Sequence, residues 1–149
     1  MFSPVVADLM AMPLPTIAAV NGHAAAAGFM LALSHDYIFM RKERGVLYMS
    51  ELEQGLSFPG YFLSLMRAKF ADASTLRDIA VERKIIDAAV ETPEATLEAA
   101  IRMGEQLAGR KLEGMVYASI RIGAFPELCR AVGLVVEDEE MIKMFNAKL

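Results

Sequence analysis

Residues 13–36 constrain the fold of this chain more than any other stretch. An apolar run over 16–20 carries no polar alternation, which is typical of a strand covered on both faces. Asn21-Gly22 then predicts a sharp turn. The very small residues that follow predict a helix over 24–34, and Asp36 starts the next apolar run. Backbone N–H groups at the start of such a helix, beside the end of a strand, suit a developing negative charge.

Two further short strands are expected after this helix. Residues 36–40 form a second buried strand, and 46–49 form a third after the charged turn at 41–45. A strand, a helix and a strand in close succession make a βαβ unit, which implies a parallel sheet and an α/β fold. Residues 50–60 are expected to form a loop, and helices are expected over 4–11, 61–70, 74–81, 93–108, 112–122, 126–132 and 137–146. We therefore divide the chain into a core region, 1–90, and a helical region, 91–149.

Composition excludes several classes of protein. The net charge of −4 argues against nucleic acid as the main partner. No apolar run approaches the ~18 residues of a membrane span, and no basic segment marks a signal peptide. The single cysteine, Cys129, rules out a disulfide framework and is expected to be a small buried residue. The hydrophobic content of 55% fits either a buried subunit interface or incomplete domain, or a core rich in alanine and methionine.

The chain offers few conventional catalytic side chains. Its two histidines lack the spacing of a metal site, so no metal is expected. His35 and Asp36 are expected to end the helix and begin the strand. His23 can either face a ligand or satisfy the turn. Glu51 and Glu53 follow a strand in an apolar setting, where desolvation would raise a carboxyl pKa and make a better base; a solvated turn is the alternative.

Two motifs carry a resemblance to a known family. The first is Pro-Thr-Ile-Ala-Ala-Val-Asn-Gly, followed by small residues, a glycine and Leu-Ala-Leu-Ser-His-Asp. It resembles the enoyl-CoA hydratase/isomerase (crotonase) superfamily. The second comprises Tyr-Met-Ser-Glu-Leu-Glu-Gln-Gly-Leu and Val-Tyr-Ala-Ser-Ile-Arg, which resemble plant peroxisomal Δ3,Δ2-enoyl-CoA isomerases. The resemblance implies the C-terminal part of a crotonase (ClpP-like) fold, with short parallel-sheet ββα units followed by helices.

The resemblance also implies roles for particular residues. By motif position, the N–H of Ala27 is one of two donors to the thioester oxygen. Family hydratases carry a glutamate two residues after the last glycine of the motif, where this chain has Met30, so hydration lacks one of its two acids. Glu51 then serves as the lone acid/base of an isomerase, while Glu53 has no matching role. The residues expected to contact substrate are Ala26, Gly28, Met30, Phe58, Tyr61 and Phe62.

Partners and location follow from the same resemblance. The substrate is an acyl-CoA thioester, and no separate cofactor is implied because CoA enters with the substrate. A homo-oligomer, trimer or hexamer, is implied. The C-terminal tripeptide Ala147, Lys148 and Leu149 is close to Ser-Lys-Leu, the address read by the peroxisomal import receptor.

The resemblance has two breaks. Relatives carry a long segment before the position of Met1, and they carry additional residues near Ile79–Glu82, so the chain is expected to be truncated. Two alternatives to an active isomerase follow. One is an inactive fragment that acts only as an oligomerisation partner, and the other, disfavoured by Met30, is a 2-enoyl-CoA hydratase.

Overall fold

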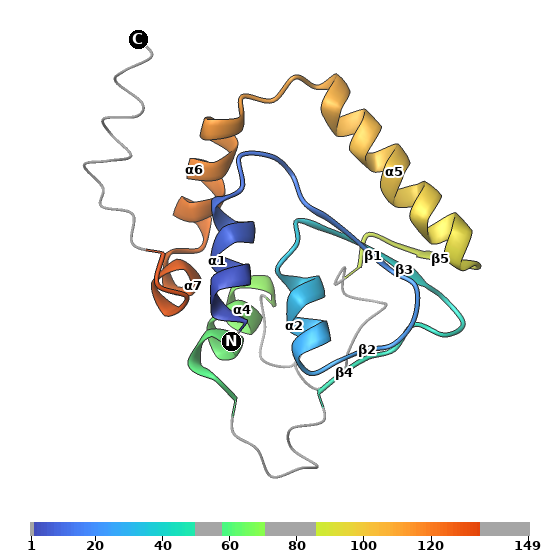
Figure 1. Ribbon diagram of the computed structural model, residues 1–149, viewed down its shortest axis with the longest axis horizontal. Helices are drawn as coiled ribbons and strands as arrows, with labels where there is room; N and C mark the ends of the chain where they lie inside the picture. Colours follow the sequence, from blue (N-terminus) through green and yellow to red (C-terminus); the bar gives the residue numbers. More distant parts are fainter. Residues whose placement is uncertain (1, 50–57, 71–85, 135–149) are drawn as a thin grey trace.

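A computed structural model describes residues 2–49, 58–70 and 86–134 (Figure 1). In chain order the elements are α1 (Ser3–Ala11), β1 (Ile17–Val20), β2 (Ala24–Ala25), α2 (Ala27–Leu33), β3 (Tyr37–Arg41), β4 (Leu47–Tyr48), α4 (Gly60–Lys69), β5 (Ala88–Val90), α5 (Pro93–Gly109), α6 (Gly114–Ala124) and α7 (Pro126–Ala131). None of the helices in these ranges is long and apolar enough to cross a membrane. The predicted helices at 74–81 and 137–146 lie outside the described residues.

The main sheet is parallel, as the βαβ pattern predicts. Its strand order is β1-β3-β5, with Ile17 opposite Tyr37 and Phe39 opposite Ala88. Strand β5 was not anticipated from the sequence, because three residues are too few to show a pattern. The predicted third strand does form, as β4, but it pairs with β2 in a separate two-stranded ladder.

The helix predicted over 24–34 begins later than expected. Residues Ala24 and Ala25 are extended and pair with β4, and α2 starts only at Ala27. The backbone N–H of Ala24 donates to the carbonyl of Val46 at 2.9 Å. Pairing with β4, which lies later in the sequence, therefore makes Ala24 and Ala25 extended although alanine favours a helix.

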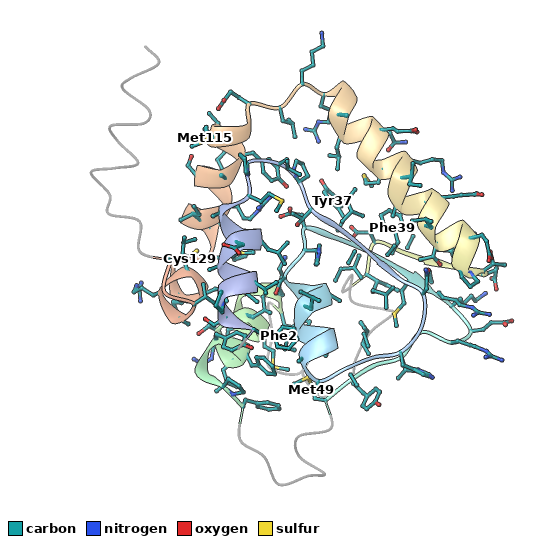
Figure 2. All side chains as sticks on the ribbon, viewed as in Figure 1. Phe2, Tyr37, Phe39, Met49, Met115 and Cys129 are labelled. Atoms are coloured by element: carbon teal, nitrogen blue, oxygen red, sulfur yellow. The ribbon has the colours of Figure 1, made fainter. Side chains whose placement is uncertain are left out.

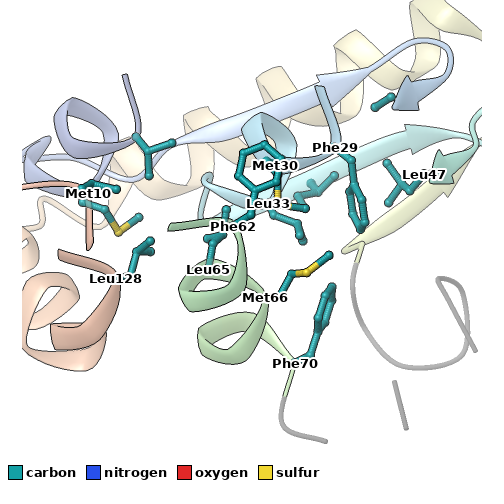
Figure 3. Packing of buried hydrophobic residues seen from close by; sticks show 14 of the residues in the cluster. Met10, Phe29, Met30, Leu33, Leu47, Phe62, Leu65, Met66, Phe70 and Leu128 are labelled. Atoms are coloured by element: carbon teal, nitrogen blue, oxygen red, sulfur yellow. The ribbon is translucent and has the colours of Figure 1, made fainter. Parts of the chain in front are cut away.

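Helices cover both faces of the main sheet. Helix α5 crosses one face, against β1 and β3, and Phe39 is buried on that side (Figures 1 and 2). Ile38 and Met40 point to the other face and join the main hydrophobic cluster. Figure 3 shows this cluster between α2 and α4, where Phe29, Met30 and Leu33 meet the apolar side of α4. Burial of large side chains such as these contributes roughly 1.5–3 kcal/mol each.

Local sequence signals set the ends of several helices. Thr92 caps α5, since its side-chain oxygen accepts from the N–H of Ala95 at 3.1 Å. Glu113 caps α6 in the same way, accepting from Val116 at 2.8 Å. A proline stands at the start of α1, α5 and α7, where its missing N–H costs nothing.

A buried ion pair joins the α6 layer to the sheet. Arg121 Nη2 lies 2.8 Å from Asp36 Oδ2, and the two side chains are 3% and 14% exposed. The same carboxylate oxygen accepts from the N–H and the hydroxyl of Thr16 at the start of β1. The guanidinium also donates to the carbonyls of Leu9, Met12 and Leu14. One arginine thus fixes the whole connection from α1 to β1.

Candidate functional site

The corner between β2 and α2 has an unusual backbone. Ala26 has φ 49° and ψ −117°, a conformation that glycine adopts far more readily than alanine. Two hydrogen bonds hold it there: its N–H donates to the carbonyl of Tyr48 at 2.9 Å, and its carbonyl accepts from the N–H of Met30 at 3.0 Å. The ladder on one side and the helix on the other therefore impose the strained geometry.

At the start of α2 this corner has backbone donors for which no acceptor is found among the described residues. The N–H groups of Ala27 and Gly28 precede the first bond within the helix, and no side chain of Ala26 caps them. Ala27 is half-buried and Gly28 is exposed. A Cβ built on Gly28 meets no described atom within 4 Å. Among the described residues, the space in the side-chain direction of Gly28 is therefore open.

The other predicted contact residues divide into two sets. Met30 and Phe62 are 1% and 4% exposed and belong to the core beneath the corner. Phe58 and Tyr61 are only partly buried against that core. The ring of Tyr61 meets that of Phe62 edge-on at 4.8 Å between centroids, and burial raises the pKa of the Tyr61 phenol. The structure thus brings Phe58, Tyr61 and Phe62 together at the start of α4.

The predicted acid/base and the C-terminal tripeptide belong to the parts of the chain that the structure does not describe. Glu51 and Glu53 lie outside the described residues, as do Ala147, Lys148 and Leu149. The acid/base assignment stays a prediction from the motif.

The remaining sequence predictions concern the histidines and the cysteine. His35 Nδ1 lies 2.8 Å from the carbonyl of Leu31 at the end of α2, and Asp36 precedes β3, so both have the structural positions expected. His23 is exposed between β1 and β2, with no hydrogen bond found to a described residue. Cys129 is buried, as predicted (Figure 2). Within the described ranges no cluster of residues is able to hold a metal ion.

A small polar cavity that the sequence did not suggest lies between the ends of α2 and α4. It has a volume of about 90 Å³ and is lined in part by His35, Asp36, Lys69 and Asp87. Lys69 Nζ donates to the carbonyl of His35 at 2.9 Å, and burial lowers the pKa of this amine while the Asp36 carboxylate opposes the shift. No pattern around Lys69 marks it, because its neighbours come from distant parts of the chain.

Comparison with known sequences identifies related proteins. The family model described as enoyl-CoA hydratase/isomerase matches residues 2–110. Enoyl-CoA delta isomerase 2, peroxisomal, of Arabidopsis thaliana is 52% identical over 145 residues, which are 89% of this chain and 60% of the relative. Enoyl-CoA delta isomerase 3 of the same plant is 48% identical, covering 92% of this chain and 63% of the relative. The chain thus spans about three fifths of the length of these relatives.

Solved structures share the fold. A crystal structure of an enoyl-CoA hydratase from Mycobacterium marinum superposes with a TM-score of 0.75 at 20% identity, covering 87% of this chain and 60% of that one. The human mitochondrial delta3-delta2-enoyl-CoA isomerase superposes with a TM-score of 0.69 at 15% identity, covering 98% and 65%. The predicted crotonase-type α/β architecture is thereby confirmed.

Proposed function

Because the chain belongs to the enoyl-CoA hydratase/isomerase family, we propose that it is a Δ3,Δ2-enoyl-CoA isomerase. The observation that carries this proposal is 52% identity to a plant protein named enoyl-CoA delta isomerase, over 89% of this chain. The reaction would move the double bond of a 3-enoyl-CoA to the conjugated trans-2 position. This is a step of fatty-acid β-oxidation, and it needs no cofactor besides the CoA of the substrate.

The proposed chemistry uses one acid and one backbone donor. Glu51 removes a proton from C2 of the substrate, and the negative charge spreads into a dienolate. The N–H of Ala27 donates to the thioester oxygen, and Glu51 then returns its proton to C4. A donor of this kind lowers a barrier by roughly 3 kcal/mol. The position of Ala27 at the start of α2, where its N–H has no acceptor among the described residues, supports this role.

The acyl chain is proposed to lie against the aromatic residues at the start of α4. Phe58 and Tyr61 offer partly exposed apolar surface, while Phe62 supports them from the core. Met30 supports isomerase over hydratase chemistry in a simple way. Its side chain is 1% exposed and has no ionisable group, so position 30 supplies no second acid for the addition of water.

The reaction can be followed by the ultraviolet absorbance of the conjugated thioester. The chain should convert a 3-enoyl-CoA, and Glu51→Gln should lower kcat by about 10²–10⁴-fold. Glu53→Gln is the matched control and should retain the parent rate. No conjugation by the parent chain would refute the activity, whereas equal rates for the two variants would refute only the role of Glu51. Rapid loss of absorbance with crotonyl-CoA would instead support a hydratase.

We further propose a peroxisomal location and a homo-oligomer, trimer or hexamer. Two Arabidopsis relatives are named peroxisomal, and the chain ends in Ala-Lys-Leu. A fluorescent protein fused before Met1 should enter peroxisomes through the import receptor, and removal of the last three residues should leave it outside them. Entry that does not depend on these residues would contradict their role as the address.

A further inference from the structure

Among the lysines that the structure describes, Lys69 alone has its amine inside the fold. The side chain of Lys42 is 63% exposed, and Lys111 is exposed as well. Lys69 is the last residue of α4, and its Nζ donates to the carbonyl of His35 at 2.9 Å. The same nitrogen lies 5.3 Å from the centre of the Phe125 ring. These contacts hold the amine between the end of α2 and the junction of α6 and α7.

The charged groups around this amine already have other partners. Among the residues that the structure describes, no carboxylate forms an ion pair with Lys69. The carboxylate of Asp36 lies 2.8 Å from Arg121 Nη2. The carboxylate of Asp87 accepts from the N–H of Ile38 at 2.6 Å. Both carboxylates therefore keep a hydrogen-bond donor if Lys69 loses its charge.

The position of Lys69 favours the neutral form of its amine. Burial lowers the pKa of Lys69, the Asp36 carboxylate opposes this shift, the Arg121 guanidinium reinforces it and the Asp87 carboxylate opposes it. A neutral amine has the electron pair that an attack on a carbonyl carbon requires. Lys42 differs, because its hydrogen bond to Glu91 raises its pKa. The fold therefore favours a nucleophilic amine at position 69 and a charged one at position 42.

The polar cavity beside Lys69 has room for a small group on this amine. Its volume of about 90 Å³ corresponds to roughly three water molecules at about 30 Å³ each. An acetyl group adds only two carbons and an oxygen. Leu33, Ile38 and Phe70 line the cavity and are buried, so they offer an apolar surface to a methyl group (Figure 3 shows Leu33 and Phe70). A short acyl group matches this space, and a long acyl chain exceeds it.

We propose that Lys69 is a site of covalent acylation by short acyl-CoA thioesters. The electron pair of Nζ attacks the carbonyl carbon of the thioester. A C–N bond forms as the C–S bond breaks, and CoA leaves as a thiolate that takes up the proton lost by the nitrogen. Nothing is oxidised or reduced, and no third reactant is needed. The amide N–H that remains on Lys69 can still donate to the carbonyl of His35.

The acyl donor belongs to the class of compound that the proposed function assigns as substrate. The inference rests on that function for the donor alone, because Glu51 takes no part in the acylation. The modification also removes the positive charge that now faces the Phe125 ring. It therefore changes a contact between the end of α4 and the junction of α6 and α7.

The experiment measures the acetylation of each lysine in the complete chain. The protein is incubated with acetyl-CoA, and peptides are analysed by mass spectrometry at successive times. We expect Lys69 to be acetylated at least about tenfold faster than Lys42. In concentrated urea the ratio of the two rates should fall to about one, since both amines then have the ordinary lysine pKa. Because mass is measured, a chain without isomerase activity still tests the inference.

Donor length and two matched variants complete the test. Decanoyl-CoA should acylate Lys69 at least about tenfold more slowly than acetyl-CoA does, and Lys42 should not distinguish the two donors. Lys69→Arg should remove the fast phase of acetylation, whereas Lys42→Arg should leave it unchanged. The inference is overturned if Lys69 in the parent chain reacts no faster than Lys42, if its advantage persists in urea, or if decanoyl-CoA modifies it as fast as acetyl-CoA.

Discussion

Replacing Ala26 with glycine should stabilise the protein, although glycine usually does the opposite. Ala26 has φ 49° and ψ −117°, and hydrogen bonds to Tyr48 and Met30 hold it there. An alanine in a sparsely populated conformation of this kind costs on the order of 1–3 kcal/mol. Glycine adopts it without a Cβ clash, so the strain is released while both hydrogen bonds remain.

Two smaller effects oppose this gain. Glycine loses more backbone entropy on folding, which costs roughly 0.5–1 kcal/mol. The half-buried methyl group of Ala26 contributes a fraction of the ~0.8 kcal/mol of a fully buried carbon. The balance favours Ala26→Gly by about 1 kcal/mol. For a chain of this length that corresponds to a melting temperature higher by about 2–4 °C.

The assay is urea denaturation followed by circular dichroism, with thermal melting as a second measurement. Ala27→Gly is the control, since Ala27 is the first residue of α2 and pays only the ordinary cost of glycine. The two adjacent alanines should therefore respond with opposite signs. A loss of stability at both positions would refute the strained geometry at Ala26 and, with it, the account of the corner.

Three more outcomes are expected. Arg121→Met should destabilise the protein by about 3–5 kcal/mol, because it leaves a buried carboxylate without its cationic partner and three carbonyls without their donor. Arg102→Ala, in a pair that is 62% and 67% exposed, should change the free energy of unfolding by less than ~1 kcal/mol. Equal effects of the two variants in urea denaturation would contradict the buried pair. Burial lowers the pKa of Lys69, so at pH values between the folded-state pKa and 10.5 the unfolded chain binds more protons than the folded protein. The stability of the parent relative to Lys69→Met should therefore rise as the pH increases through this range toward 10.5. A stability difference that stays flat between pH 8 and pH 10 would contradict this. Gly45→Ala should destabilise by about 1–3 kcal/mol because the new Cβ would overlap the carbonyl oxygen of Arg41, and a melting temperature equal to that of the parent would contradict this packing.

Predictions from the sequence agree best with the structure where residues close together in the sequence determine the local conformation. The apolar run at 16–20 predicted β1 because a strand covered on both faces needs no polar alternation. Thr92, Pro93 and Gly109 predicted the ends of α5 because cap hydrogen bonds involve residues that are close in sequence. The composition of the motif also identified the family, which the match over residues 2–110 confirms.

The candidate site shows where local patterns fail. Ala24 and Ala25 have the composition of a helix, but β4 draws them into a ladder through the carbonyls of Val46 and Tyr48. Nothing about an alanine predicts the positive φ of Ala26. That value results from a strand on one side and a helix on the other, and neither is encoded in the residue itself.

The sequence by itself determined the family and the order of most elements, because these depend on neighbours along the chain. Tertiary structure alone decided which distant groups meet. Asp36 and Arg121 are 85 positions apart, and Lys69 reaches His35 across 34. Such contacts form only when separate elements pack together, since each partner lies on a different element. The place of β1 at the edge of the described sheet is likewise a property of the assembled strands and cannot be predicted from its own four residues.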